Sequence, residues 1–130
     1  MTINLTEVLN TGQRITQKML DGGDVVLLNI CNSISSYYGK TVDEVCKVTR
    51  KADVVRPRQM IHFFLWLTGK YSLTTIGEIV GKKDHATVLW GRDRVRDLNR
   101  FDIEVKFDVN ELYKKLGHYL CSERVNSVSL

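Results

Sequence analysis

The sequence predicts an all-α protein of one domain, with about five to seven helices and a helix-turn-helix near the middle of the chain. Apolar residues recur at helical spacing along most of the chain, and short polar residues that cap helix N-termini precede several of these segments. The 130 residues, of which 43% are hydrophobic, suffice for one hydrophobic core but not for two domains of ordinary size.

Residues 1–23 form a leader in which one or two short helices are expected, and a glycine pair at residues 22–23 separates it from the rest. Asp24 is placed to cap the next helix, and Gly39 is placed to end it. The core face of that helix carries apolar residues at intervals of three and four, Leu27, Cys31, Ile34 and Tyr38.

Thr41 and Glu44 have the spacing of a capping box, in which each side chain bonds a backbone N–H at the start of a helix. This pair predicts a short helix that buries Val42 and Val45. The basic stretch at residues 47–51 lacks helical apolar periodicity, so we expect an exposed loop there.

Pro57, the only proline, is expected at the first position of the following helix, and Gly69 is expected to end that helix. Phe63 and Trp66 add a second apolar face to it, which predicts that other elements cover it on more than one side. Its first apolar stripe consists of Met60, Ile61, Phe64, Leu65 and Leu67.

The next two helices have the pattern of a helix-turn-helix. Ser72 is placed to cap a helix over residues 73–80, which Gly81 ends, and Asp84 is placed to cap the helix after it. A glycine within the core seam of the second helix would let another helix approach closely. The seam consists of Val88, Gly91, Val95 and Leu98.

Beyond Phe101 the pattern is ambiguous, because apolar residues alternate over residues 103–109 as they do in a strand. A lone strand has no visible partner in this chain. We therefore expect a loop, then a terminal helix that starts with Asp108 and Glu111, and a frayed tail from Ser122.

The first turn of the helix after Asp84 has the composition of a surface that reads DNA. A helix-turn-helix presents the N-terminal end of its second helix to the major groove. Short polar or methyl-bearing side chains there contact base edges and thymine methyl groups, and flanking cations contact phosphates. The first-turn residues are Asp84, His85, Ala86 and Thr87.

The distribution of charge favours a polyanionic partner. The formal net charge is +4. Residues 40–100 hold 13 Lys and Arg against 7 Asp and Glu, an excess of 6, while the segments on either side each carry a net charge of −1. Positive charge that gathers in the middle of the chain suits nucleic acid.

The three cysteines, Cys31, Cys46 and Cys121, have neither the number nor the spacing of a disulfide framework or a zinc site, and each is expected to act as a small buried apolar residue. The first 20 residues lack the apolar run of a signal peptide, and no stretch approaches the length of a membrane span. These features predict a cytoplasmic protein that binds no membrane and no metal.

Residues 24–100 resemble the C-terminal DNA-binding domain of the bacterial replication initiator DnaA. The matching motifs keep the family's order and spacing without a gap, and together they cover a little over half of the chain. They are Tyr37-Tyr38, a basic loop around Arg50, Arg56-Pro57-Arg58-Gln59-Met60, Ser72-Leu73 with Ile76-Gly77, and Asp84-His85 followed by Thr87-Val88-Leu89.

This resemblance implies a Trp-repressor-like helix-turn-helix that binds short A·T-rich boxes in double-stranded DNA. It implies that Arg50 enters the minor groove. It also implies that bases in the major groove are read by Arg58, Gln59, Asp84, His85, Ala86 and Thr87. We expect phosphate or backbone contacts from Lys51, Arg56, Thr74, Lys82, Lys83 and Arg92.

The chain departs from the family pattern in three respects. Lys82-Lys83 stands where the family usually has Gly-Arg. Ala86 stands where it usually has Thr and keeps a methyl but loses the hydroxyl, so the target sequence is expected to be relaxed or different. DnaA proteins also carry an AAA+ ATPase domain ahead of this module. Here only about twenty residues precede the match, and the sequence has no GxxxxGKS/T phosphate loop, so we expect no ATP-driven unwinding.

The expected organisation is a leader over residues 1–23, a DNA-binding domain over 24–121 and a tail over 122–130.

Two alternative functions stay open. The chain could be a module that uses the same fold to bind another replication protein, or a transcription regulator with its own target. An enzyme is the weakest interpretation, because the sequence has no Gly-rich phosphate loop, no paired carboxylates on one face and no nucleophile with a recognisable base. We expect no cofactor and no small-molecule substrate. Trp90 is expected to pack between helices rather than to lie near the DNA backbone.

Overall fold

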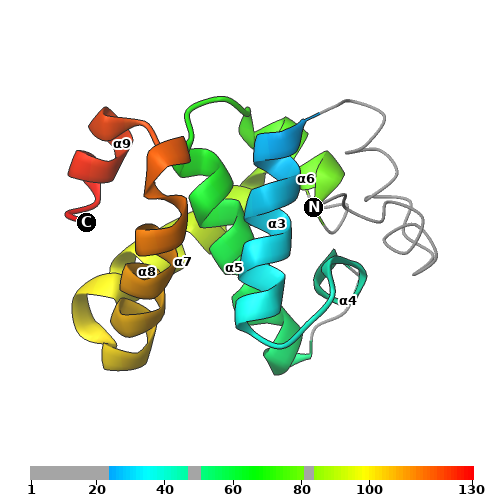
Figure 1. Ribbon diagram of the computed structural model, residues 1–130, viewed down its shortest axis with the longest axis horizontal. Helices are drawn as coiled ribbons and strands as arrows, with labels where there is room; N and C mark the ends of the chain where they lie inside the picture. The colour runs from blue at the N-terminus through cyan, green and yellow to red at the C-terminus, as the bar shows by residue number, and fades with distance from the viewer. Residues whose placement is uncertain (1–23, 47–50, 81–83) are drawn as a thin grey trace, which may run out of the picture.

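The computed structural model describes residues 24–46, 51–80 and 84–130, and these residues contain no strand (Figure 1). They form seven α-helices and one 3-10 helix, which agrees with the predicted all-α class. The elements are α3 (Val25–Tyr37), α4 (Val42–Cys46), α5 (Ala52–Leu67), α6 (Leu73–Ile79), α7 (His85–Phe101), α8 (Ile103–Leu116), η1 (Gly117–Tyr119) and α9 (Ser122–Ser127).

Helix α5 runs through the middle of the molecule, and α3, α4, α6 and α7 all pack against it (Figure 1). Phe63 and Phe64 are both fully buried, although adjacent residues on a helix point in different directions. This confirms the prediction that the helix is covered on more than one side. Because α5 is buried all round, it fixes the positions of the shorter helices that surround it.

Three of the predicted helix caps are confirmed. Asp24 Oδ1 accepts a hydrogen bond from the Leu27 N–H at 2.9 Å and starts α3. The capping box before α4 is complete, since Thr41 Oγ1 accepts from the Glu44 N–H at 3.1 Å and Glu44 Oε1 accepts from the Thr41 N–H at 3.2 Å. Gly39 follows α3 with a φ of 70°, a conformation that favours glycine.

The predicted position of Pro57 at the start of its helix is wrong. Helix α5 begins at Ala52, so Pro57 lies inside it. Lys51 takes an extended conformation at the N-cap, although no side chain caps this end. A proline here removes one backbone hydrogen bond near the helix start, a cost that the burial of α5 offsets.

The predicted loop after Phe101 is also wrong. Asp102 Oδ1 accepts from the Val105 N–H at 3.0 Å and caps α8 directly after α7. The tail from Ser122 is not frayed, because residues Ser122–Ser127 form α9 and Val125 is buried. The Arg124 guanidinium donates to the Trp66 carbonyl at 2.6 Å, which attaches α9 to α5.

Asp108 joins α3 to α8. Its two carboxylate oxygens accept hydrogen bonds from the hydroxyls of Tyr37 at 2.6 Å and of Tyr38 at 3.0 Å. Burial and this carboxylate raise the pKa of Tyr37 to about 12 and raise the pKa of Tyr38 further. Both hydroxyls therefore stay protonated and donate to Asp108 at neutral pH.

Cys31 and Cys46 are buried, as predicted, whereas Cys121 is partly exposed. Burial raises the pKa of the Cys31 thiol, which keeps it uncharged in the core. Within the described part of the chain, no helix combines the length and the apolar character that crossing a bilayer requires.

Candidate nucleic-acid interface

Helices α6 and α7 pack against each other and both contact α5. Ser72 Oγ accepts from the Thr75 N–H at 3.1 Å and starts α6, as predicted. Helix α6 ends at Ile79, one residue earlier than expected, and the predicted stop at Gly81 lies outside the described residues. Helix α7 follows within a few residues, which is the connection of a helix-turn-helix.

The first turn of α7 is exposed and capped. Asp84 Oδ1 accepts from the Thr87 N–H at 2.8 Å, which confirms the predicted cap, and this hydrogen bond lowers the pKa of the Asp84 carboxyl. His85, Ala86 and Thr87 are all exposed. The capped end therefore offers three consecutive side chains to a partner without any change in the fold.

A close contact at Gly91 holds α7 in place. A Cβ atom on this residue would lie 3.3 Å from Gln59 Cγ and 3.3 Å from His62 Nδ1, both on α5. Contacts this tight leave little room for a larger side chain. The predicted approach of another helix at Gly91 is confirmed, and α5 is the helix that approaches.

Two of the expected base-reading residues have little exposed surface. Arg58 is 5% exposed, and its Nε donates to the carbonyl of Val45 on α4 at 2.9 Å. Burial lowers the pKa of this guanidinium. Gln59 is 7% exposed and its Oε1 accepts from Arg56 Nη1 at 2.9 Å. Both residues therefore contribute to the packing of α5, in contrast to the exposed first turn of α7.

The expected phosphate contacts are spread over several elements. Lys51 and Thr74 are exposed, and Arg56 is partly exposed. Arg92 is held by neighbours, since its Nη2 lies 2.7 Å from Asp93 Oδ1 and its guanidinium lies 4.5 Å from the ring centre of Trp66. Arg92 is thus already engaged by Asp93 and Trp66. The other two expected phosphate contacts, Lys82 and Lys83, lie outside the described residues, as does the expected minor-groove residue Arg50.

The prediction that Trp90 packs between helices is wrong. Trp90 is 61% exposed on α7. The seam residues Val88, Gly91 and Val95 are buried, and a residue two positions after Val88 points away from that seam. The spacing of these seam residues in the sequence therefore already indicates that Trp90 faces outward.

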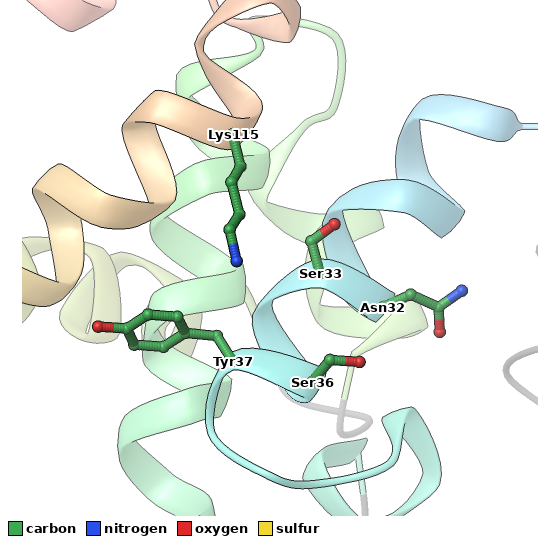
Figure 2. A pocket seen from close by; sticks show the side chains of 5 residues that line it. All are labelled: Asn32, Ser33, Ser36, Tyr37 and Lys115. Carbon is green, nitrogen blue, oxygen red and sulfur yellow. The ribbon is translucent and has the colours of Figure 1, made fainter.

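The molecule also has an open pocket of about 350 Å³ between α3 and α8. Figure 2 shows its polar lining, with the Lys115 side chain extending from α8 toward α3. None of the lining residues belongs to α6 or α7, so the pocket is separate from the helix-turn-helix. The lining residues are Asn32, Ser33, Ser36, Tyr37 and Lys115.

Among the described residues, no group of His, Cys, Asp and Glu could hold a metal ion.

A capped and exposed second helix, packed with its partner against a buried central helix, defines a helix-turn-helix domain of the DNA-binding type. The family described as bacterial dnaA protein helix-turn-helix matches residues 28–95. The chain belongs to this family.

Similar proteins from three organisms are each described as chromosomal replication initiator protein DnaA. The protein from Rickettsia akari (strain Hartford) is 30% identical over 112 residues, which cover 85% of this chain and 24% of the relative. The proteins from Rickettsia canadensis (strain McKiel) and Rickettsia massiliae (strain Mtu5) are each 30% identical over 110 residues, which cover 83% of this chain and 24% of the relative. The chain thus spans about a quarter of these relatives. No solved structure matches it.

Proposed function

We propose that this chain binds double-stranded DNA in a sequence-specific manner, with the first turn of α7 in the major groove. The observation that carries the proposal is the run of three exposed side chains at the capped start of α7, His85, Ala86 and Thr87. The N-terminus of a helix also has a partial positive charge that favours an approach to phosphates. The excess of cations in the middle of the chain supports the same partner.

Individual roles follow from the chemistry of each side chain. His85 and Thr87 can exchange hydrogen bonds with base edges, and the methyl of Ala86 can contact a thymine methyl. Asp84 stands at the same end of the helix, where a carboxylate accepts from a cytosine amino group. Arg58 and Gln59 are proposed to contact bases only through the small part of their surface that is exposed.

The proposed contacts to the backbone and the minor groove have different roles. Arg50 is proposed to enter the minor groove beside the site, where a narrow A·T-rich groove concentrates negative potential. Phosphate contacts position the protein and carry no direct base information. They are proposed for Lys51, Arg56, Thr74, Lys82 and Lys83, and for Arg92 only if it leaves its intramolecular partners.

We further propose that the target is an A·T-rich box and that the binding serves replication initiation or its regulation in the cytoplasm. The relatives' description as chromosomal replication initiators supports this role. We propose a binding module without catalytic or ATPase activity, because the sequence has no phosphate loop of the GxxxxGKS/T type.

The experiment selects duplexes from a random library with the full chain and then measures affinity for the best duplex at several salt concentrations. We expect one enriched sequence and a log–log slope of affinity against salt of about −4 to −7, because several neutralised phosphates release counterions. Recovery of no preferred sequence would contradict specific binding. Affinity that does not change with salt would contradict DNA as the partner.

A second candidate is a module that binds another replication protein. It is favoured by a cluster of exposed apolar side chains where α7 meets α8, namely Phe101 at 83%, Ile103 at 86% and Phe107 at 59% exposed. Contiguous exposed apolar residues often mark protein contacts. Salt-insensitive binding of a protein partner that is lost in the double variant Phe101→Ser, Ile103→Ser would favour this candidate over DNA binding.

A further inference from the structure

Trp90 is a large aromatic side chain on the surface of α7. It is 61% exposed and stands outside the hydrophobic core. The other tryptophan, Trp66, is enclosed instead, with the guanidinium of Arg92 at 4.5 Å and that of Arg124 at 4.8 Å from its ring centre. Single exposed apolar residues are common on proteins, so exposure alone assigns no role to Trp90.

The position of Trp90 on α7 is more informative than its exposure. Trp90 follows Ala86 by four residues and Thr87 by three, so it lies on the same outward face, about 6 Å further along the helix axis. The next outward residue, Arg94, is exposed. One more turn along, the face carries Asp97 and then Phe101, both exposed.

The charges along this face limit how much of α7 can contact DNA. Asp93 also lies on this face, but its carboxylate is neutralised by Arg92 at 2.7 Å and by Arg96 at 3.3 Å. The carboxylate of Asp97 is 58% exposed with only a longer contact to Arg96 at 3.5 Å, so phosphates repel it more strongly. The face of α7 that can approach DNA therefore runs from His85 to about Arg94, and Trp90 lies in the middle of it. An indole on this face has one matching apolar group in the major groove, the 5-methyl group of thymine.

We propose that Trp90 is a specificity-determining residue that packs against the 5-methyl group of a thymine next to the base pairs faced by Ala86 and Thr87. This inference rests on the proposed function. It adds to it a preference for thymine at one position, read by apolar contact without any hydrogen bond.

The first test compares the full chain with its Trp90→Ala variant on the duplex selected from the random library. Each thymine of that duplex is replaced in turn by deoxyuridine, which lacks only the 5-methyl group. We expect Trp90→Ala to lower the affinity about tenfold. One such replacement should lower the affinity of the native chain about fourfold, and the same replacement should leave the affinity of the Trp90→Ala variant unchanged. Trp90→Phe, which keeps an aromatic ring, should retain most of the affinity.

The second test uses fluorescence with Trp66→Phe as the matched control. Trp66 is not among the proposed DNA contacts, and phenylalanine keeps an aromatic ring beside Arg92 and Arg124, so this variant should bind the selected duplex with native affinity. Trp90 is then the only tryptophan. We expect the emission of Trp90 to change when the duplex is added. Unchanged emission at saturation would overturn the proposal, as would native affinity in Trp90→Ala.

Different results would contradict the role of Trp90 and the DNA binding itself. Equal losses in native chain and variant for every deoxyuridine replacement would overturn the role of Trp90 while leaving DNA binding intact. Failure of the native chain to bind any selected duplex would overturn the proposed function together with this inference. Circular dichroism of each variant excludes a loss of fold, which the exposure of Trp90 makes unexpected.

Discussion

The two ends of α7 are both exposed, but they differ in chemistry. At the first turn, His85, Ala86 and Thr87 present short side chains, two of them polar. At the last turn, Phe101 is exposed beside Ile103 at the start of α8. Polar side chains can exchange hydrogen bonds with base edges, whereas a phenylalanine and an isoleucine cannot. Both ends are therefore available surface, and only their chemistry distinguishes the end proposed to read DNA from the apolar end.

Capping explains why each end has its conformation. At the first turn, Asp84 caps α7 only. At the last turn Asp102 ends α7, because its N–H donates to the Leu98 carbonyl at 2.7 Å, and its side chain also caps α8. One residue thus connects two helices, and the side chains on either side of it, Phe101 and Ile103, are left outside the core.

The largest expected effect is on stability and comes from a substitution at Gly91, between the two ends of α7. Gly91→Leu would force a side chain into the contact with Gln59 and His62, so we expect the free energy of unfolding to fall by about 3 kcal/mol. DNA binding should weaken with it, because the same contact positions the first turn of α7. Urea denaturation measures the first effect. Asp97→Leu, at an exposed position of the same helix, is the control and should change stability little. Native stability in Gly91→Leu would contradict the close approach.

The second prediction compares how substitutions at the two ends of α7 affect the affinity for DNA. His85→Ala should lower the affinity for the selected duplex about tenfold, because a good base contact is worth about 1–3 kcal/mol. The double variant Phe101→Ser, Ile103→Ser at the other end should bind the duplex like the native chain. Competition against a labelled duplex measures both. Equal losses at the two ends would show that the difference in chemistry does not divide their functions.

Local signals in the sequence predicted the start of most helices. The hydrogen bonds of Asp24, Ser72 and Asp84 each join residues three positions apart, so their pattern is visible without the fold. The start of α8 was missed because Ile103, Val105, Phe107 and Val109 alternate. In the structure, Val105 and Val109 are buried while Ile103 and Phe107 are exposed, so the alternation reflects two faces of one helix.

Contacts between distant segments could not be predicted in the same way. The burial of Arg58 against the Val45 carbonyl depends on how α4 packs on α5, and no periodicity reports it. The link from Tyr37 and Tyr38 to Asp108 joins residues about seventy positions apart. The outward direction of Trp90 was predictable, because the seam through Val88, Gly91 and Val95 determines it, but the usual burial of aromatic residues favoured the opposite interpretation.

A smaller effect is expected from Ala86, where the resemblance to DnaA implies a threonine. Ala86→Thr adds a hydroxyl beside a methyl at an exposed position, so the fold should not change. The hydroxyl can restore a hydrogen bond to a base edge and should sharpen discrimination against a single altered base pair in an A·T-rich box by about tenfold or less. Competition with the intact and the altered box measures this ratio. An unchanged or lower ratio would mean that this chain has its own target.

The smallest expected effect concerns the cap of α7. Asp84→Asn keeps a capping side chain but removes the charge, so it tests the carboxylate apart from the cap. The Thr87 N–H lowers the pKa of Asp84 in the folded state, so the carboxylate's contribution to stability is present above its ordinary pKa of 3.8 and is lost as the pH falls through the lower folded value. The difference in melting temperature between native chain and variant should therefore be small and constant near neutral pH and should shrink below pH 3.8. Thermal unfolding at several pH values measures this difference, and one that grows on acidification would contradict the sign of the pKa shift.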